Sequence, residues 1–321
     1  MSRTFALTIR MLPAPLARAV AVAYLVCRVA DTIEDDSELP VPRRRELLAE
    51  WRAAIQNGQS ANFAVEDVGH TEDEHALMRI VESVQRELHR LDAEDVHAIE
   101  RYAVEMIEGM SVSLAPRPDS TTPLFATQAA LEQYCYFVAG TVGLMLTDLY
   151  QNHARSVRGE CLAIMRRHAV HFGLGLQLTN VIRDVRNDLA EGRVYYPASL
   201  WDANGMTPAG FFAPDRVDES WAVVRPLLQR ADQMLQDALA YSLAVPRRAF
   251  RIRLFCVVQL LFATRTLALV RRNAALGVAS TTVKMPRREV YLLLGVAALS
   301  LPSSTAIAWV VRRLQRAWRL P

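Results

Sequence analysis

Apolar residues recur every three to four positions along several long segments of the chain, whereas few stretches alternate strictly between apolar and polar residues. A period of three to four is that of an α-helix with a buried face, and strict alternation is that of a strand. Only 13 glycines and 15 prolines interrupt the 321 residues. The pattern therefore predicts an all-α protein, with helices at 16–29, 43–56, 74–91, 93–114, 131–151, 161–188, 216–243 and 250–273.

The segments between the predicted helices are short and polar or rich in proline, such as 58–70 and 115–127. We find no internal repeat, low-complexity tract or flexible linker that would divide the chain. One all-α domain over residues 1–321 is therefore the economical interpretation.

The segment 290–311 holds 22 uncharged residues between charged flanks and is long enough to span a bilayer. Ser300, Pro302 and the polar residues after them break it into two short halves. The break favours a kinked or paired core helix over a membrane-spanning one. The following 312–319 is basic and contains Trp318, so we keep open that 290–321, an apolar and basic C-terminal helical segment, makes peripheral contact with a membrane surface.

The cysteines and the N-terminus indicate a cytoplasmic protein, with membrane association left open. Residues 1–12 lack the layout of a signal peptide because Arg10 interrupts the apolar stretch. The spacing of the cysteines fits neither a zinc site nor a disulfide, and their apolar surroundings predict buried, reduced thiols at Cys27, Cys135, Cys161 and Cys256.

The net charge of +3 hides an asymmetry, since residues 246–321 carry +13 and residues 1–245 carry −10. The basic end is where anions or anionic lipids would be drawn. Its arginines alternate with long aliphatic runs and match no nucleic-acid-binding motif, so we expect no nucleic-acid partner.

Two acidic clusters, at 31–36 and 184–188, carry the chemistry of the chain. Asp31 and Asp35 are four residues apart, as are Asp184 and Asp188, so each pair lies on one face of a helix. Carboxylates held together in apolar surroundings require a cation, and Mg²⁺ binds one or two carboxylates together with phosphate oxygens. If the fold brings the two helices face to face, the clusters form a Mg²⁺–diphosphate site.

Neighbouring residues support this hypothesis without deciding it. Gln177 and Asn180 extend the second acidic cluster into a polar stripe, which would face either solvent or a polar cavity. Gly173 and Gly175 indicate close approach of another group, because glycine inside a helix is unfavourable. The small residues within 139–143 either leave room for a pocket or allow close packing of another helix. His168 and His171 have no third partner at convincing spacing and are predicted to be ordinary histidines rather than metal ligands.

Five sequence blocks together resemble the squalene/phytoene synthases. They are Ser2-Arg3-Thr-Phe5, the segment Tyr24 to Asp36, the segment Tyr134 to Gly143, Gln177-Leu-Thr-Asn180-Val-Ile-Arg183-Asp184, and Gly192-Arg193-Val-Tyr-Tyr-Pro197. The blocks occur in the family's order and cover the chain to about residue 290. The resemblance implies the isoprenoid synthase fold, a single helical bundle around a central cavity.

The resemblance also implies roles for individual residues. Asp31, Asp35, Asp184 and Asp188 would hold Mg²⁺ ions, with Glu34 and Asn180 as further ligands. Tyr134 would assist proton removal, with the diphosphate as an alternative base. The substrate-binding residues it implies are Ser2, Arg3, Phe5, Tyr24, Arg28, Gln177, Arg183 and Arg193. One departure is Asn187, where squalene-forming members often carry an acid, and it leaves the number of carboxylate ligands open.

Within the family, the stretches from Arg253 and from Val283 resemble the squalene-forming branch, and the chain is most similar to bacterial members. The implied reaction joins two farnesyl diphosphates head to head through presqualene diphosphate and reduces the product to squalene with NADPH. Lys284, Arg287 and Arg288 would bind the phosphates of NADPH. The alternatives are a phytoene or dehydrosqualene synthase without NADPH, a cyclase acting on one substrate, and a noncatalytic helical scaffold.

Overall fold

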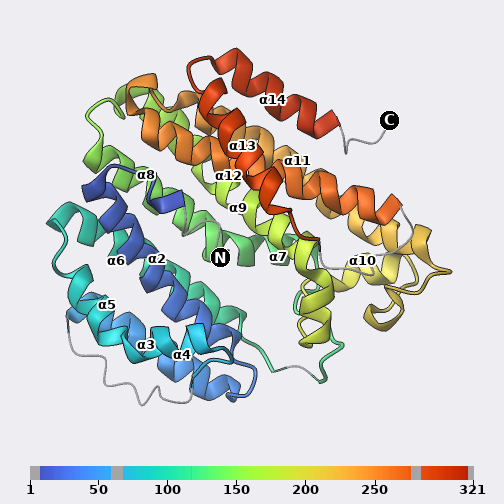
Figure 1. Ribbon diagram of the computed structural model, residues 1–321. Helices are drawn as coiled ribbons and strands as arrows, with labels where there is room; N and C mark the ends of the chain where they lie inside the picture. Colours follow the sequence, from blue (N-terminus) through green and yellow to red (C-terminus); the bar gives the residue numbers. More distant parts are fainter. Residues whose placement is uncertain (1–7, 59–67, 117, 276–282, 317–321) are drawn as a thin grey trace. The chain divides into compact units, whose positions relative to one another are not determined.

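A computed structural model describes residues 8–58, 68–116, 118–275 and 283–316 (Figure 1). These residues form helices joined by turns and loops, and no strand occurs among them. The prediction of an all-α protein is therefore confirmed. The chain divides into two compact units, one built from Met1–Pro116 and Thr141–Arg158, the other from Arg117–Gly140 and Gly159–Pro321. The single domain expected over 1–321 stays a prediction.

The first unit is organised around its longest helix, which is α2. Pro15 in the first turn of α2 needs no backbone donor there, and α2 packs against α3, α5, α6 and α8 (Figure 1). Its buried side chains are aliphatic or small, including Leu16, Val20 and Val26. The helices of this unit are α2 (Ala14–Asp35), α3 (Val41–Asn57), α4 (Glu72–Arg79), α5 (Val81–Leu88), α6 (Ala93–Ser113) and α8 (Thr141–His153).

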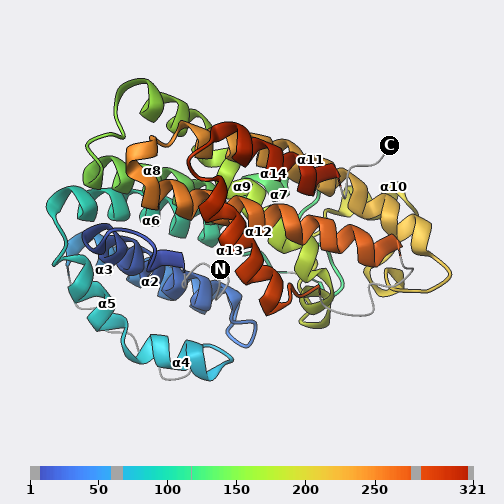
Figure 2. The same ribbon diagram turned by 45° about the horizontal axis from the view of Figure 1, so that its top comes forward.

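The second unit is built on α9 and α11, which lie side by side in both views (Figures 1 and 2). Helix α12 packs against both of them and carries a row of fully buried residues such as Val257, Leu260 and Leu267. The α-helices of this unit are α7 (Gln128–Cys135), α9 (Gly159–Ala190), α10 (Ala198–Ala203), α11 (Val217–Ala244), α12 (Phe250–Ala275), α13 (Arg287–Ser300) and α14 (Ser304–Arg316).

Three predicted helices differ from the observed ones in ways that matter for the site. The first continues to Asp35, so Asp31 and Asp35 both lie within α2. The predicted helix 74–91 is two helices that meet at Ile80. The predicted helix 131–151 is interrupted by a π-helical turn, Tyr136–Gly140. Turns of this kind insert an extra residue into the helix and often occur at functional sites.

The glycine of α9 nearest this π-helical turn is there for close packing. A Cβ atom on Gly173 would lie 2.1 Å from the carbonyl oxygen of Ala139 and 2.6 Å from the carbonyl carbon of the same residue. A Cβ on Gly140 would meet Leu174 at 3.0 Å. The expected close approach at Gly173 is confirmed, and the small residues at 139 and 140 pack directly on α9.

We expect Gly173→Ala to lower the free energy of unfolding by about 1–3 kcal/mol, because the clash is with backbone atoms that have no rotamer to change. Gly295→Ala on α13 is the matched control, since a Cβ there meets open space and alanine favours a helix by about 1 kcal/mol. Urea unfolding of both variants measures this difference. Equal stability of Gly173→Ala and the wild type would contradict the close approach.

The break predicted within 290–311 is present, because α13 ends at Ser300 and α14 begins at Ser304. Three polar contacts hold this hairpin on α11 and α12. Arg265 donates twice to Glu289 at 2.9 Å, buried Arg253 donates to Ser304 at 2.8 Å, and Gln315 donates to Asp232 at 2.8 Å.

One helical segment in the described part of the chain, Arg247–Arg272, is long and apolar enough to cross a membrane. The most apolar 18-residue stretch of this segment is 83% buried inside the protein, which is typical of a core helix.

Candidate functional site

The C-terminal half of α2 carries a polar stripe on an otherwise buried helix. Tyr24, Arg28, Asp31 and Asp35 follow one another at intervals of four, three and four residues, and all are half-buried. Six of the intervening positions are buried, namely Val26, Cys27, Val29, Ala30, Thr32 and Ile33, and the other two, Leu25 and Glu34, are half-buried. The two aspartates are therefore one helical turn apart on the face of α2 that is not covered by the core of its unit.

Arg28 links this stripe to the start of α4. One of its guanidinium nitrogens lies 3.5 Å from an oxygen of Asp31, and the other lies 3.6 Å from an oxygen of Glu74. Burial alone would lower the pKa of Arg28, but the negative charges around it, Asp31 foremost, outweigh burial and raise it. Burial also raises the pKa of Tyr24. The stripe thus presents a fixed cation beside its carboxylates.

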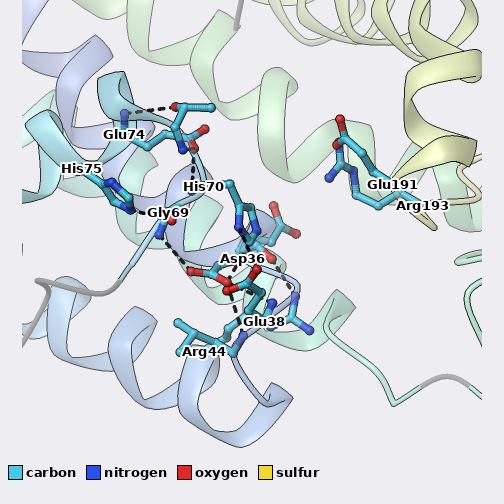
Figure 3. A network of polar contacts seen from close by, with 12 residues as sticks. Asp36, Glu38, Arg44, Gly69, His70, Glu74, His75, Glu191 and Arg193 are labelled. Atoms are coloured by element: carbon cyan, nitrogen blue, oxygen red, sulfur yellow. Dashed lines mark hydrogen bonds and ion pairs between the residues drawn. The ribbon is translucent and has the colours of Figure 1, made fainter.

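Asp36, the last residue of the first acidic cluster, has a different role from Asp31 and Asp35. Its side chain is 2% exposed and accepts hydrogen bonds from the backbone N–H groups of Glu38, Leu39 and Gly69, at 3.0, 3.3 and 2.9 Å (Figure 3). Asp36 therefore ends α2 and holds the segment before α4 against it.

Glu74 completes this arrangement from the first turn of α4 (Figure 3). Its carboxylate accepts the backbone N–H groups of His70 and Thr71, both at 3.0 Å, and the Thr71 hydroxyl accepts the N–H of Glu74. Burial would raise the pKa of Glu74, but these hydrogen bonds and Arg28 outweigh burial and lower it. Thr71-x-x-Glu74 is a capping-box pattern, which is the sequence signal that would have identified this residue.

We expect Glu74→Gln to lower the free energy of unfolding by about 1 kcal/mol at neutral pH, because glutamine can still accept the capping hydrogen bonds but lacks the negative charge that favours the helix N-terminus and Arg28. Because the folded pKa lies below the ordinary 4.5, the carboxylate stabilises the fold above pH 4.5, and this contribution disappears as the pH falls through the folded pKa. The deficit of the variant should therefore shrink on acidification. Unfolding curves at neutral and acidic pH measure it, with Glu72→Gln as the exposed control on the same turn. A deficit independent of pH would contradict the assignment.

The second acidic helix, α9, has the same organisation in the other unit. Gln177, Asn180, Asp184 and Asp188 are half-buried, and the positions between and before them, from Phe172 to Gly175 and at Leu178, Thr179, Val181 and Ile182, are buried. The other sides of α9 are thus covered as far as Ile182, whereas beyond it Val185 and Arg186 are half-buried and Asn187 is exposed. Arg183 forms a two-pronged contact with the carboxylate of Asp184, one bond at 2.8 Å.

The loop after α9 brings a second arginine to the end of the stripe. Gly192 has a left-handed backbone, with φ of 69°, and the N–H of Arg193 then donates to the carbonyl of Asp188 at 2.7 Å. The Arg193 guanidinium lies 3.4 Å from the Asp188 carboxylate and also contacts Glu191. Each aspartate of α9 therefore has an arginine beside it.

Tyr134 lies at the end of α7, where it is 7% exposed. Its ring packs against Phe125, with centroids 5.2 Å apart, and against Tyr195, at 5.9 Å. Phe125 had no signal in the sequence that would have associated it with Tyr134, because it comes from the proline-rich break before α7.

For the remaining predicted site residues, the structure gives fewer contacts or none. Ser2, Arg3 and Phe5 lie outside the described residues. Glu34 is half-buried on α2, and its carbonyl accepts from Arg44 at 2.7 Å. At the start of α13, the side chains of Lys284, Arg287 and Arg288 are exposed.

His168 and His171 both contact one carboxylate, that of Asp237, at 2.9 and 2.5 Å. Among the residues the structure describes, no three His, Cys, Asp or Glu side chains gather as ligands of one metal ion. The half-buried oxygen donors of each acidic stripe, in pairs, fit Mg²⁺, which takes one or two carboxylates and completes its shell with water and phosphate.

The fold is that of the isoprenoid synthases, as predicted. The structure of TcSQS in complex with the ligand BPH1237 is 25% identical in sequence, matches 99% of this chain and 95% of that one, and has a TM-score of 0.80. A dehydrosqualene synthase, 20% identical, matches 94% of this chain and 92% of its own with a TM-score of 0.64, which supports the fold alone.

A family model described as squalene/phytoene synthase matches residues 1–289, and the chain belongs to that family. Squalene synthase from Schizosaccharomyces pombe is 29% identical over 90% of this chain and 61% of its own length. The rat squalene synthase is 28% identical over 96% of this chain and 70% of its own. The chain spans about three fifths of the length of the first curated relatives it matches. Similarity to bacterial members stays a prediction.

Proposed function

We propose that this protein catalyses the head-to-head condensation of two farnesyl diphosphates to presqualene diphosphate and then reduces it to squalene with NADPH. The family joins prenyl diphosphates head to head and uses Mg²⁺. The observation that carries the proposal is the pair of acidic stripes, each half-buried on a covered helix and each with arginines beside its aspartates.

Asp31 and Asp35 on α2, and Asp184 and Asp188 on α9, are the residues that would hold Mg²⁺, with Glu34 and Asn180 as further oxygen donors. When bound, Mg²⁺ would neutralise the diphosphate and favour its departure as a leaving group. Arg28, Arg183 and Arg193 would bind diphosphate oxygens, because guanidinium groups pair with phosphate in a two-pronged geometry. In this proposal the arginines exchange their contacts with the aspartates for contacts with the substrate.

The apolar parts of the substrate require residues that exclude water and tolerate positive charge. Tyr24 on the first stripe and the ring cluster of Tyr134, Phe125 and Tyr195 present aromatic faces, which stabilise a cation without reacting with it. We propose that Tyr134 assists removal of the proton that is lost when the cyclopropane ring closes. Gln177 and the N-terminal Ser2, Arg3 and Phe5 complete the proposed substrate contacts.

Binding of NADPH is assigned to the exposed Lys284, Arg287 and Arg288, which offer cations for the cofactor's phosphates. The relatives named squalene synthase support the reductive reaction for this chain. A phytoene or dehydrosqualene synthase, which needs no reductant, is the second candidate, because the family model that matches the chain is described as squalene/phytoene synthase.

The test is to incubate the purified protein with farnesyl diphosphate and Mg²⁺, with and without NADPH, and to identify the extracted products. Squalene formed only with NADPH, together with presqualene diphosphate accumulating without it, is the expected result. A conjugated C30 triene formed equally in both reactions would assign the protein to the second candidate. No product from farnesyl or geranylgeranyl diphosphate would contradict catalysis and favour a scaffold.

A further inference from the structure

The outer face of α13 is apolar and exposed. Its exposed positions after the first turn are Tyr291, Leu292, Gly295, Ala298 and Leu299, which share one side of the helix. Tyr291, Leu292 and Leu299 are 71%, 64% and 85% exposed. The opposite side of α13, with Leu293, Ala297 and Ser300, is buried.

Exposed apolar residues are concentrated on this hairpin. Of the seven large apolar side chains that are exposed in the described part of the chain, four lie on α13 and α14, and the other three are scattered singly. The fourth on the hairpin is Trp309 of α14, which shares its exposed side with Arg312, Arg313 and Arg316. Scattered exposed apolar residues are ordinary, whereas a contiguous patch marks an interaction surface.

The charge of the α13–α14 hairpin indicates which kind of partner binds this surface. Its one acid, Glu289, is paired with Arg265 of α12, so the exposed arginines of α14 are not neutralised by an acid of their own hairpin. A second copy of the chain would bring the same positive charge to the contact and be repelled. Tryptophan, tyrosine and leucine next to arginines are the composition of helices that lie at the surface of an anionic membrane.

We infer that the outer face of α13, with Trp309 and the arginines of α14, is a docking surface for an anionic lipid bilayer, on which the protein lies without crossing it. The contacts of Arg265 with Glu289 and of Gln315 with Asp232 keep the hairpin on the protein body, so docking needs no unfolding. The surface lies within the C-terminal segment 290–321, for which the sequence left membrane association open, and it places the apolar contact on the outer face of α13. It does not depend on the proposed reaction.

The experiment is co-sedimentation of the full chain with vesicles of phosphatidylcholine alone or mixed with phosphatidylglycerol. Wild type should bind the anionic vesicles, less so as salt increases, and Leu292→Glu with Leu299→Glu should lower the partition coefficient by at least roughly tenfold. The matched control is Val112→Glu on α6, which is 79% exposed and should bind as wild type does.

A second pair of variants tests the charge. Arg312→Gln with Arg313→Gln should lower the partition coefficient by roughly thirtyfold at low salt, since each arginine near an anionic surface contributes roughly fivefold. Arg86→Gln on α5 with Arg90→Gln just after it removes the same charge from exposed arginines elsewhere and should change binding little.

Helix content by circular dichroism and turnover in solution confirm that the variants are folded. The inference is overturned if wild type fails to bind anionic vesicles, or if Leu292→Glu with Leu299→Glu binds as wild type does. It is also overturned if light scattering shows a wild-type dimer that this variant dissociates, because the occupant would then be a second copy.

Discussion

Replacing Asp184 with Asn is expected to lower the rate of product formation by a factor on the order of 100 to 1,000, because a neutral amide cannot supply the charge that holds Mg²⁺ against the diphosphate. Asp184 is only half-buried, so the fold should tolerate the change. Asp31→Asn is expected to behave in the same way on α2. Turnover of farnesyl diphosphate and urea unfolding, measured on the same preparations, separate lost chemistry from lost structure.

The matched control for both variants is Asp237→Asn on α11. Asp237 is also half-buried and is also paired, in its case with His168 and His171, but it lies outside the acidic stripe. Its replacement should leave turnover within a factor of about three, as expected for a surface pair. Full turnover in Asp184→Asn, or an equal loss in Asp237→Asn, would contradict the role given to the stripes.

Tyr134→Phe is the second substitution that we expect to have a large effect on catalysis. If the hydroxyl assists proton removal, its loss should lower kcat roughly 100-fold or more, the scale of general acid–base catalysis, while KM changes little. The ring contacts with Phe125 and Tyr195 are retained in the variant, so its packing should persist. Steady-state kinetics with farnesyl diphosphate measure both constants.

Tyr196→Phe provides the control for removing a phenolic hydroxyl from the same unit. Tyr196 is 2% exposed, its hydroxyl has no hydrogen-bond partner in the described structure, and burial raises its pKa, with Asp188 adding to the effect. Removing an unsatisfied buried hydroxyl should leave the free energy of unfolding unchanged or raise it by about 1 kcal/mol. A loss of kcat in Tyr196→Phe as large as in Tyr134→Phe would show that the effect is not specific to Tyr134.

The helical fold and the two acidic stripes were predictable because both follow from local periodicity. Positions 177, 180, 184 and 188 share a helix face whatever the tertiary structure is, and the structure shows that face half-buried. The break between α13 and α14 was predictable for a similar local reason, the polar residues and proline at 300–305.

The parts that were not predicted depend on long-range contacts. Asp36 belongs to the acidic cluster by sequence, but its role comes from Gly69, which is 33 residues away. The π-helical turn at 136–140 lies where the backbone of Ala139 approaches Gly173, and the expected helix 131–151 did not include it. The exposed face of α13 could not be predicted because its segment is apolar on all sides. Composition does not show which side of such a helix the rest of the protein covers.

Release of inorganic diphosphate from farnesyl diphosphate tests the central claim most directly, because that claim is that the two aspartate pairs use Mg²⁺ to ionise the substrate. We predict no release in EDTA and full release when Mg²⁺ is restored, whereas Asp31→Asn and Asp184→Asn with Mg²⁺ should release diphosphate at least roughly 100-fold more slowly than the wild type. Diphosphate release that continues in EDTA, or that either variant retains at the wild-type rate, would contradict it.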